Sequence, residues 1–193
     1  MSARKFSMTF MFIFVCVFTL VGCRDHVING PLNEEELITT LGLSFTELDE
    51  SGEPAGEPIH FFWRDVDASG SPEIDAVLLK AQKSYRLEIT VLDESRTPLV
   101  DITNQIIEEG LDHQFFFLTD GIDASIAYED SDAAGKPLGV QNIVTSGSTG
   151  TGTLTVVLRH EPEKNAPGVS DGEILNAGGE TDIEAIFPFT ITE

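Results

Sequence analysis

The feature that most constrains the fold of this chain is an alternation of apolar and polar residues in short segments. In residues 85–91 every second side chain is apolar, and residues 37–45 and 183–191 follow a similar pattern near the two ends of the mature sequence. A period of two residues is typical of a β-strand that buries one face. Pro188 lies in the last of these segments and cannot donate a hydrogen bond to a neighbouring strand, so it predicts an edge or a bulge there.

Shorter apolar segments, separated by Gly, Pro, Asp and Ser, predict further strands. These segments lie at residues 59–63, 122–128, 140–145 and 153–159. The whole pattern indicates an all-β fold of about eight to ten strands with at most one short helix, and we expect a β-sandwich of immunoglobulin-like type. The repeated helices of ten or more residues that a doubly wound or periplasmic-binding-type α/β fold requires are not predicted.

Residues 102–118 allow two interpretations. The segment 102–107 is rich in β-branched residues and 114–118 is aromatic, which favours two strands of a hairpin with its turn at residues 108–112. The alternative is a short helix over residues 103–109, capped by Thr103 and stopped at Gly110. We favour the hairpin.

The N-terminus has the layout of a secretory signal. Arg4 and Lys5 precede an apolar run over residues 10–21, which at about a dozen residues is shorter than the roughly 20 needed to span a bilayer. The sequence Leu-Val-Gly-Cys at residues 20–23 resembles the lipobox of bacterial lipoprotein signals. We therefore expect a signal peptide over residues 1–22, a lipid on Cys23, a tether over residues 23–34 and a β-sandwich domain over residues 35–193.

Removal of the signal leaves a strongly acidic chain. Without Arg4 and Lys5, nine basic residues remain against 33 acidic ones, a net charge of −24. Such a surface repels nucleic acid and anionic lipid headgroups, so attachment to the membrane is expected to depend on the lipid. Cys16 leaves with the signal and Cys23 carries the lipid, so the mature domain has no thiol for a disulfide, a metal ion or a nucleophile.

One internal repeat offers candidate metal ligands. Residues 63–72 and 128–137 share the pattern aromatic-x-Asp-x-Asp-Ala-x-Gly-x-Pro, and the first copy matches the first half of a calcium loop. The candidate calcium ligands are Asp65, Asp67, Ser69, Asp130 and Asp132. Position twelve, where an EF-hand has Glu, is Ala76 in one copy and Gln141 in the other. The alternative, which we favour, is that Asp and Gly serve tight turns.

Two histidines have acidic neighbours. His113 lies beside Glu108, Glu109 and Asp112. His160 lies beside Glu161, with Asp171 and Glu173 further along the chain. Neither group has a recognised metal-ligand spacing. We interpret both histidines as solvated surface residues and expect no catalytic residues.

Three segments carry a resemblance to a known family. They are residues 33–41 (NEEELITTL), 113–117 (HQFFF) and, above all, 159–184, with the runs RHEP, GVSDG and NAGGETDIE. They resemble a family of small acidic lipoproteins common in Bacteroidota, some of which are described as type 1 periplasmic binding fold superfamily proteins. The likeness covers essentially the whole mature chain. It implies a lipid-anchored cell-envelope protein and supplies no catalytic residues.

We therefore expect a lipoprotein of the outer membrane, on its periplasmic or its surface side, with a non-enzymatic binding or structural role. Its partner is a protein or a glycan, no cofactor is required, and calcium is the one candidate ion. The alternative is an accessory carbohydrate-binding lipoprotein of a nutrient-uptake system, in which exposed Phe62 or Trp63 would stack on a sugar. Because Phe61 and Trp63 share a face of their strand, we favour the core for both.

Overall fold

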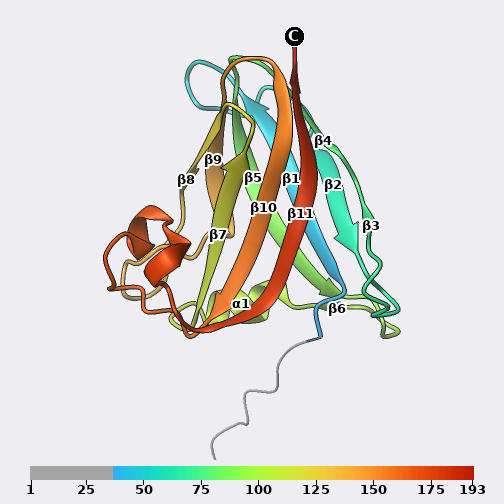
Figure 1. Cartoon of the computed structure of the whole chain (residues 1–193), viewed down its shortest axis with the longest axis vertical. Coiled ribbons are helices and arrows are strands. Elements are labelled where there is room, and N and C mark those ends of the chain that lie inside the picture. Colours follow the sequence, from blue (N-terminus) through green and yellow to red (C-terminus); the bar gives the residue numbers. More distant parts are fainter. Residues whose placement is uncertain (1–36) are drawn as a thin grey trace, which may run out of the picture. The chain divides into compact units, whose positions relative to one another are not determined.

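Figure 1 shows the computed structural model of the chain, which describes residues 37–193. The predicted signal peptide, the lipidation site at Cys23 and the tether over residues 23–34 lie outside the described residues. The described residues all belong to one compact unit. No helix in this part is long and apolar enough to cross a membrane.

The described residues form two sheets. The larger sheet has the strand order β3-β2-β1-β5-β9-β8, with the short β6 paired to β5, and all of its pairings are antiparallel. Its strands are β1 (Thr40–Leu48), β2 (Ile59–Arg64), β3 (Glu73–Ile74), β5 (Ser84–Asp93), β6 (Val100–Asp101), β8 (Ala124–Tyr128) and β9 (Gln141–Ser146).

The smaller sheet has the order β4-β11-β10-β7, in which β4 is parallel to β11 and the other pairings are antiparallel. Its strands are β4 (Val77–Lys80), β7 (His113–Asp120), β10 (Gly150–His160) and β11 (Glu180–Thr192). Two 3-10 helices, η1 (Val169–Asp171) and η2 (Ile174–Asn176), precede β11.

The hydrophobic core lies between the two sheets. Along β5 and β11 every second side chain is buried, as the alternation predicts. The largest core side chains include Phe45, Tyr85, Phe115, Phe187 and Phe189. The all-β sandwich is therefore confirmed, and nine of its strands have four or more residues, while β3 and β6 have two each. The immunoglobulin-like strand order is a finer description that stays a prediction.

Pro188 lies at a locally unpaired edge. It is opposite Thr153 of β10, and the pairing of β11 with β4 begins one residue later, at Phe189. The side of β11 away from β10 is thus free of a ladder partner at Pro188, which suits a residue without an N–H group. A bulge also occurs in β11, but near its other end, where the register with β10 shifts between Leu158 and Arg159.

The favoured hairpin at residues 102–118 is wrong, and the helical alternative is correct. Residues Thr103–Glu108 form the helix α1, which has no cap from the Thr103 side chain. Instead, Asp101 Oδ1 accepts a 2.9 Å hydrogen bond from the Thr103 N–H, and the Thr103 hydroxyl accepts one of 2.9 Å from the N–H of Val91. Ile102 and Ile106 are both buried, and their four-residue spacing is the helical signal that the β-branched composition obscured.

The chain brings many functional candidates to one end of the sandwich. Four antiparallel pairings lead from β2 through β1, β5 and β9 to β8, so β2 and β8 run in the same direction. The turns that follow these two strands therefore lie at the same end of the sheet. This end also holds α1, the start of β7 and the end of β10, whereas the C-terminus lies at the opposite end (Figure 1).

Candidate functional site

The first predicted calcium turn, after β2, is held by hydrogen bonds within itself. Asp65 accepts hydrogen bonds from the Ser69 N–H and hydroxyl, at 2.9 and 3.3 Å, and from the Gly70 N–H at 2.9 Å. Asp67 accepts a longer one of 3.2 Å from the same Ser69 N–H. Gly70 has a φ of +74°, a conformation that glycine adopts without strain. These hydrogen bonds and the glycine conformation are those of an exposed turn that aspartate side chains close.

In the second copy, after β8, the two aspartates hold a longer loop. Asp130 accepts three backbone N–H groups, those of Gly139 (2.7 Å), Val140 (2.8 Å) and Gln141 (2.9 Å). The three donors come from the chain entering β9, so Asp130 ties the end of β8 to the start of its partner strand.

Asp132 forms an ion pair with Lys164 of the same chain. Its Oδ2 accepts a 2.8 Å hydrogen bond from the ammonium of Lys164, and the side chains are only 1% and 6% exposed. Lys164 Nζ also donates to the carbonyl oxygens of Gly110 and Pro137, at 2.6 and 3.0 Å, so all three of its N–H groups are used. The second turn therefore already holds a positive charge.

Opposing effects set the pKa of Asp132. Burial raises the pKa of this carboxyl, but the hydrogen bond from Lys164 and those from the N–H groups of Lys136 and Ala134 together lower it below its ordinary value. Asp132 is therefore a carboxylate at neutral pH, paired with the Lys164 ammonium.

The structure thus accounts for all five predicted calcium ligands as parts of turns. It places the two turns at one end of the sandwich, but each carboxylate directs at least one oxygen at the backbone N–H groups of its own turn or of the strand that follows. Calcium binding by these residues stays a prediction.

Replacement of Asp130 by alanine is expected to reduce the free energy of unfolding by about 2 kcal/mol, because three N–H groups lose a charged acceptor. Urea unfolding of the variant, with 2 mM calcium and with a chelator, measures this loss. The same loss in both solutions indicates a backbone-capping role, and Asp67→Ala, in the exposed first turn, is the control with a smaller effect. A loss that occurs only with calcium present would instead identify Asp130 as a calcium ligand.

A different cluster gathers metal-ligating atoms. His113 is the first residue of β7 and His160 the last of β10, and they are directly paired across the two strands. Their rings lie edge to face, 4.8 Å apart. Asp182 completes the cluster, with Oδ2 3.7 Å from His113 Nε2 and Oδ1 3.7 Å from His160 Nδ1. Within residues 37–193 this is the group of three or more His, Cys, Asp or Glu residues whose ligand atoms all lie within 4.8 Å of one another.

The β-bulge positions Asp182. Leu158 pairs with Ile183 but Arg159 pairs with Thr181, so Asp182 is the extra residue of β11. A bulge turns a side chain away from the regular alternation, and bulges are common beside functional sites. Here it brings a carboxylate to the two imidazoles at the end of the core face of the sheet.

The interpretation of His113 as a solvated residue is wrong, because its side chain is buried. Its Nδ1 lies 3.1 Å from the carbonyl oxygen of Glu109, at the C-terminal end of α1. A carbonyl can only accept, so Nδ1 carries the proton and Nε2 faces Asp182. The acidic neighbours proposed from the sequence are absent from this cluster, whose carboxylate comes from Asp182 instead.

The aromatic residues of β2 point to both faces of the sheet. Phe61 is buried and Trp63 is half-buried against the core, which agrees with the core interpretation of both side chains. Phe62 is half-buried on the outer face, with the Arg64 guanidinium 3.9 Å from its ring centroid. The ring lies over Gly42 of β1, where a Cβ would come within 3.1 Å of it.

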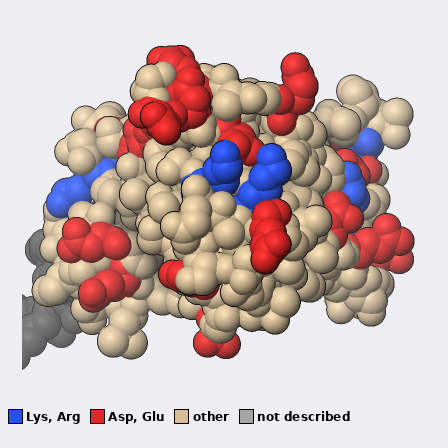
Figure 2. Space-filling view, turned by 90° about the horizontal axis from the view of Figure 1, so that it is seen from above, with Lys and Arg blue, Asp and Glu red and all other residues tan. Residues whose placement is uncertain are grey.

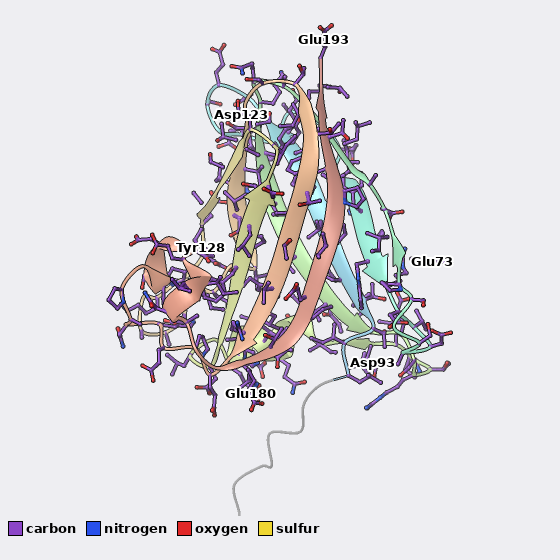
Figure 3. All side chains as sticks on the ribbon, viewed as in Figure 1. Glu73, Asp93, Asp123, Tyr128, Glu180 and Glu193 are labelled. Carbon is purple, nitrogen blue, oxygen red and sulfur yellow. The ribbon has the colours of Figure 1, made fainter. Side chains whose placement is uncertain are left out.

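Comparison with known proteins finds no matching family model, no similar curated protein and no similar solved structure. Figure 3 shows the side chains on the ribbon, with Asp93 and Glu180 labelled near the end of the sandwich opposite the C-terminal Glu193.

Proposed function

We propose that this chain is a lipid-anchored protein of the bacterial outer membrane with a non-enzymatic binding or structural role. The observation that carries the proposal is the sequence Leu-Val-Gly-Cys at residues 20–23, after a basic start and an apolar run. Acyl chains contribute about 0.8 kcal/mol of membrane affinity per buried CH₂ group, and two or more chains make a stable anchor.

The charge of the chain supports attachment through lipid rather than through electrostatics. The full sequence has a net charge of −22. Figure 2 shows acidic side chains spread over one end of the sandwich around a few basic ones, without a broad basic patch on that face. An anionic surface is repelled by anionic headgroups and by nucleic acid, which leaves a protein or a glycan as the class of partner.

The aspartates of the two turns are engaged within the fold, because Asp65, Asp130 and Asp132 all accept backbone N–H groups. The alternative role in carbohydrate binding gains little support from β2, because Trp63 packs on the core and Arg64 lies over the Phe62 ring.

The lipid anchor is tested by Cys23→Ser. We expect this variant to lose incorporation of labelled palmitate completely and to disappear from the outer-membrane fraction, because the thiol at residue 23, which is expected to carry the diacylglycerol, is removed. Metabolic labelling and membrane fractionation of the producing cells measure both effects.

Cys16→Ser is the matched control, since Cys16 lies in the apolar run that is removed. This variant should retain the label and the outer-membrane location. Undiminished labelling of Cys23→Ser, or its continued presence in the outer membrane, would contradict the proposal.

A further inference from the structure

The side chains His113, His160 and Asp182 are a donor set with a specific chemistry. Two imidazoles and one carboxylate are characteristic of divalent transition-metal sites, among them zinc sites in which the fourth position is open to water or a ligand. Calcium and magnesium prefer sites made of oxygen donors alone. The cluster therefore differs in chemistry from the two aspartate turns.

The spacing of the donor atoms fits an ion between them. Both N···O separations to Asp182 are 3.7 Å, longer than the roughly 2.7 to 2.9 Å of a charge-assisted N–H···O⁻ hydrogen bond. Metal–ligand distances of about 2.0 to 2.2 Å place the donors of a tetrahedral zinc about 3.4 Å apart. The two separations run to different oxygens of Asp182, and one ligand atom from each residue lies within 4.8 Å of the other two. Side-chain shifts that shorten these separations by up to about 1.4 Å would therefore convert the observed arrangement into a coordination shell.

A hydrogen bond from its Nδ1 orients the His113 ring as a metal ligand. A metal-bound histidine usually donates its other N–H to a carbonyl or carboxylate, which fixes the ring and its tautomer. The Glu109 carbonyl does this at Nδ1, 3.1 Å away, and leaves Nε2 directed at Asp182. The direct cross-strand pairing with His160 and the bulge at Asp182 fix the positions of the other two ligands.

We propose that His113 Nε2, His160 Nδ1 and the carboxylate of Asp182 bind one divalent transition-metal ion, with Zn²⁺ as the expected occupant. His160 and Asp182 are 16% and 14% exposed, so an ion can reach the site from solvent, while His113 forms its buried wall. The site joins β7, β10 and β11 beside the C-terminal end of α1, so binding would cross-link three strands and couple metal occupancy to the stability of this end of the sandwich.

The proposal is tested by calorimetric titration of the untagged full-length protein, purified in detergent and stripped with a chelator, with ZnCl₂. We expect one Zn²⁺ per chain and a rise in melting temperature of roughly 5 to 10 °C when zinc is about 100-fold above its Kd. His160→Ala and Asp182→Asn should each weaken binding by tenfold or more, since loss of even an outer-sphere partner costs about 10- to 100-fold. These partly exposed positions are chosen because truncation of buried His113 also threatens folding.

His60→Ala is the matched control, because His60 is an exposed histidine on β2 of the other sheet. It should bind zinc like the unaltered chain. The circular dichroism and metal-free melting temperature of each variant establish that it is folded. The proposal is overturned if the unaltered chain shows no saturable zinc binding. It is also overturned if both His160→Ala and Asp182→Asn still bind zinc like the unaltered chain, or if Asp65→Asn loses zinc binding while these two variants keep it.

Discussion

Asp132→Ala is expected to reduce the free energy of unfolding by about 3 to 5 kcal/mol, because it leaves the Lys164 ammonium buried without its counter-charge. The two side chains are almost fully buried and 2.8 Å apart. The carbonyls of Gly110 and Pro137 still accept hydrogen bonds from Lys164, but they supply no negative charge. The variant also removes the acceptor for the N–H groups of Ala134 and Lys136.

Urea unfolding at pH 7 measures this effect, and a double-mutant cycle separates its parts. Lys164→Met replaces the ammonium by an apolar group of similar length, so the double variant should be more stable than the sum of the two single losses predicts. Lys80→Met is the matched control, because it breaks a 3.0 Å ion pair with Glu47 in which the lysine is 63% exposed, and exposed pairs contribute little. A loss for Asp132→Ala no larger than that for Lys80→Met would contradict the assignment.

The stability contributed by Asp132 also depends on pH in a defined direction. Its pKa is lower in the folded chain than in the unfolded chain, so its contribution is complete above the unfolded pKa of about 3.9. The contribution declines as the pH falls below that value toward the folded pKa. Asp132→Ala should therefore lose less stability on acidification than the unaltered chain does.

The sandwich could be predicted from the sequence wherever a strand buries one face and exposes the other, because apolar and polar residues then alternate. In β5 and β11 the buried residues follow one another at every second position, and the period of two is visible without knowledge of any partner strand. At α1 the same reasoning failed, because β-branched residues favour strands only as a weak preference. The burial of Ile102 and Ile106 and the hydrogen bonds at Asp101 and Thr103 determine the local structure instead.

The candidate site was harder to predict because long-range pairing creates it. His113 and His160 are 47 residues apart and meet through the register of β7 with β10. Asp182 joins them through a bulge, which shifts a side chain by one position and leaves no mark in the apolar alternation around Ile183. The repeat that contains Asp132 likewise does not predict its ion pair with Lys164, because Lys164 lies outside the repeat, in the connection after β10.

Phe187→Ala is expected to reduce the free energy of unfolding by about 3 to 5 kcal/mol, the usual cost of a cavity left by a buried phenylalanine. Phe187 is 0% exposed and lies opposite Leu154 in the core face of the β10–β11 pair. A domain of this size has a total stability of about 5 to 15 kcal/mol, so the variant should unfold at a much lower urea concentration with a similar slope.

Ile186→Ala is the control that makes this prediction specific, because Ile186 is the preceding residue, is also large and apolar, and is 48% exposed. It should change the free energy of unfolding by about 0.5 kcal/mol or less. Since neighbouring side chains of a strand point to opposite faces, a register error of one residue would exchange the two effects. Equal losses for the two variants, or a larger loss for Ile186→Ala, would contradict the burial pattern of β11 and its register with β10 on this side of the bulge.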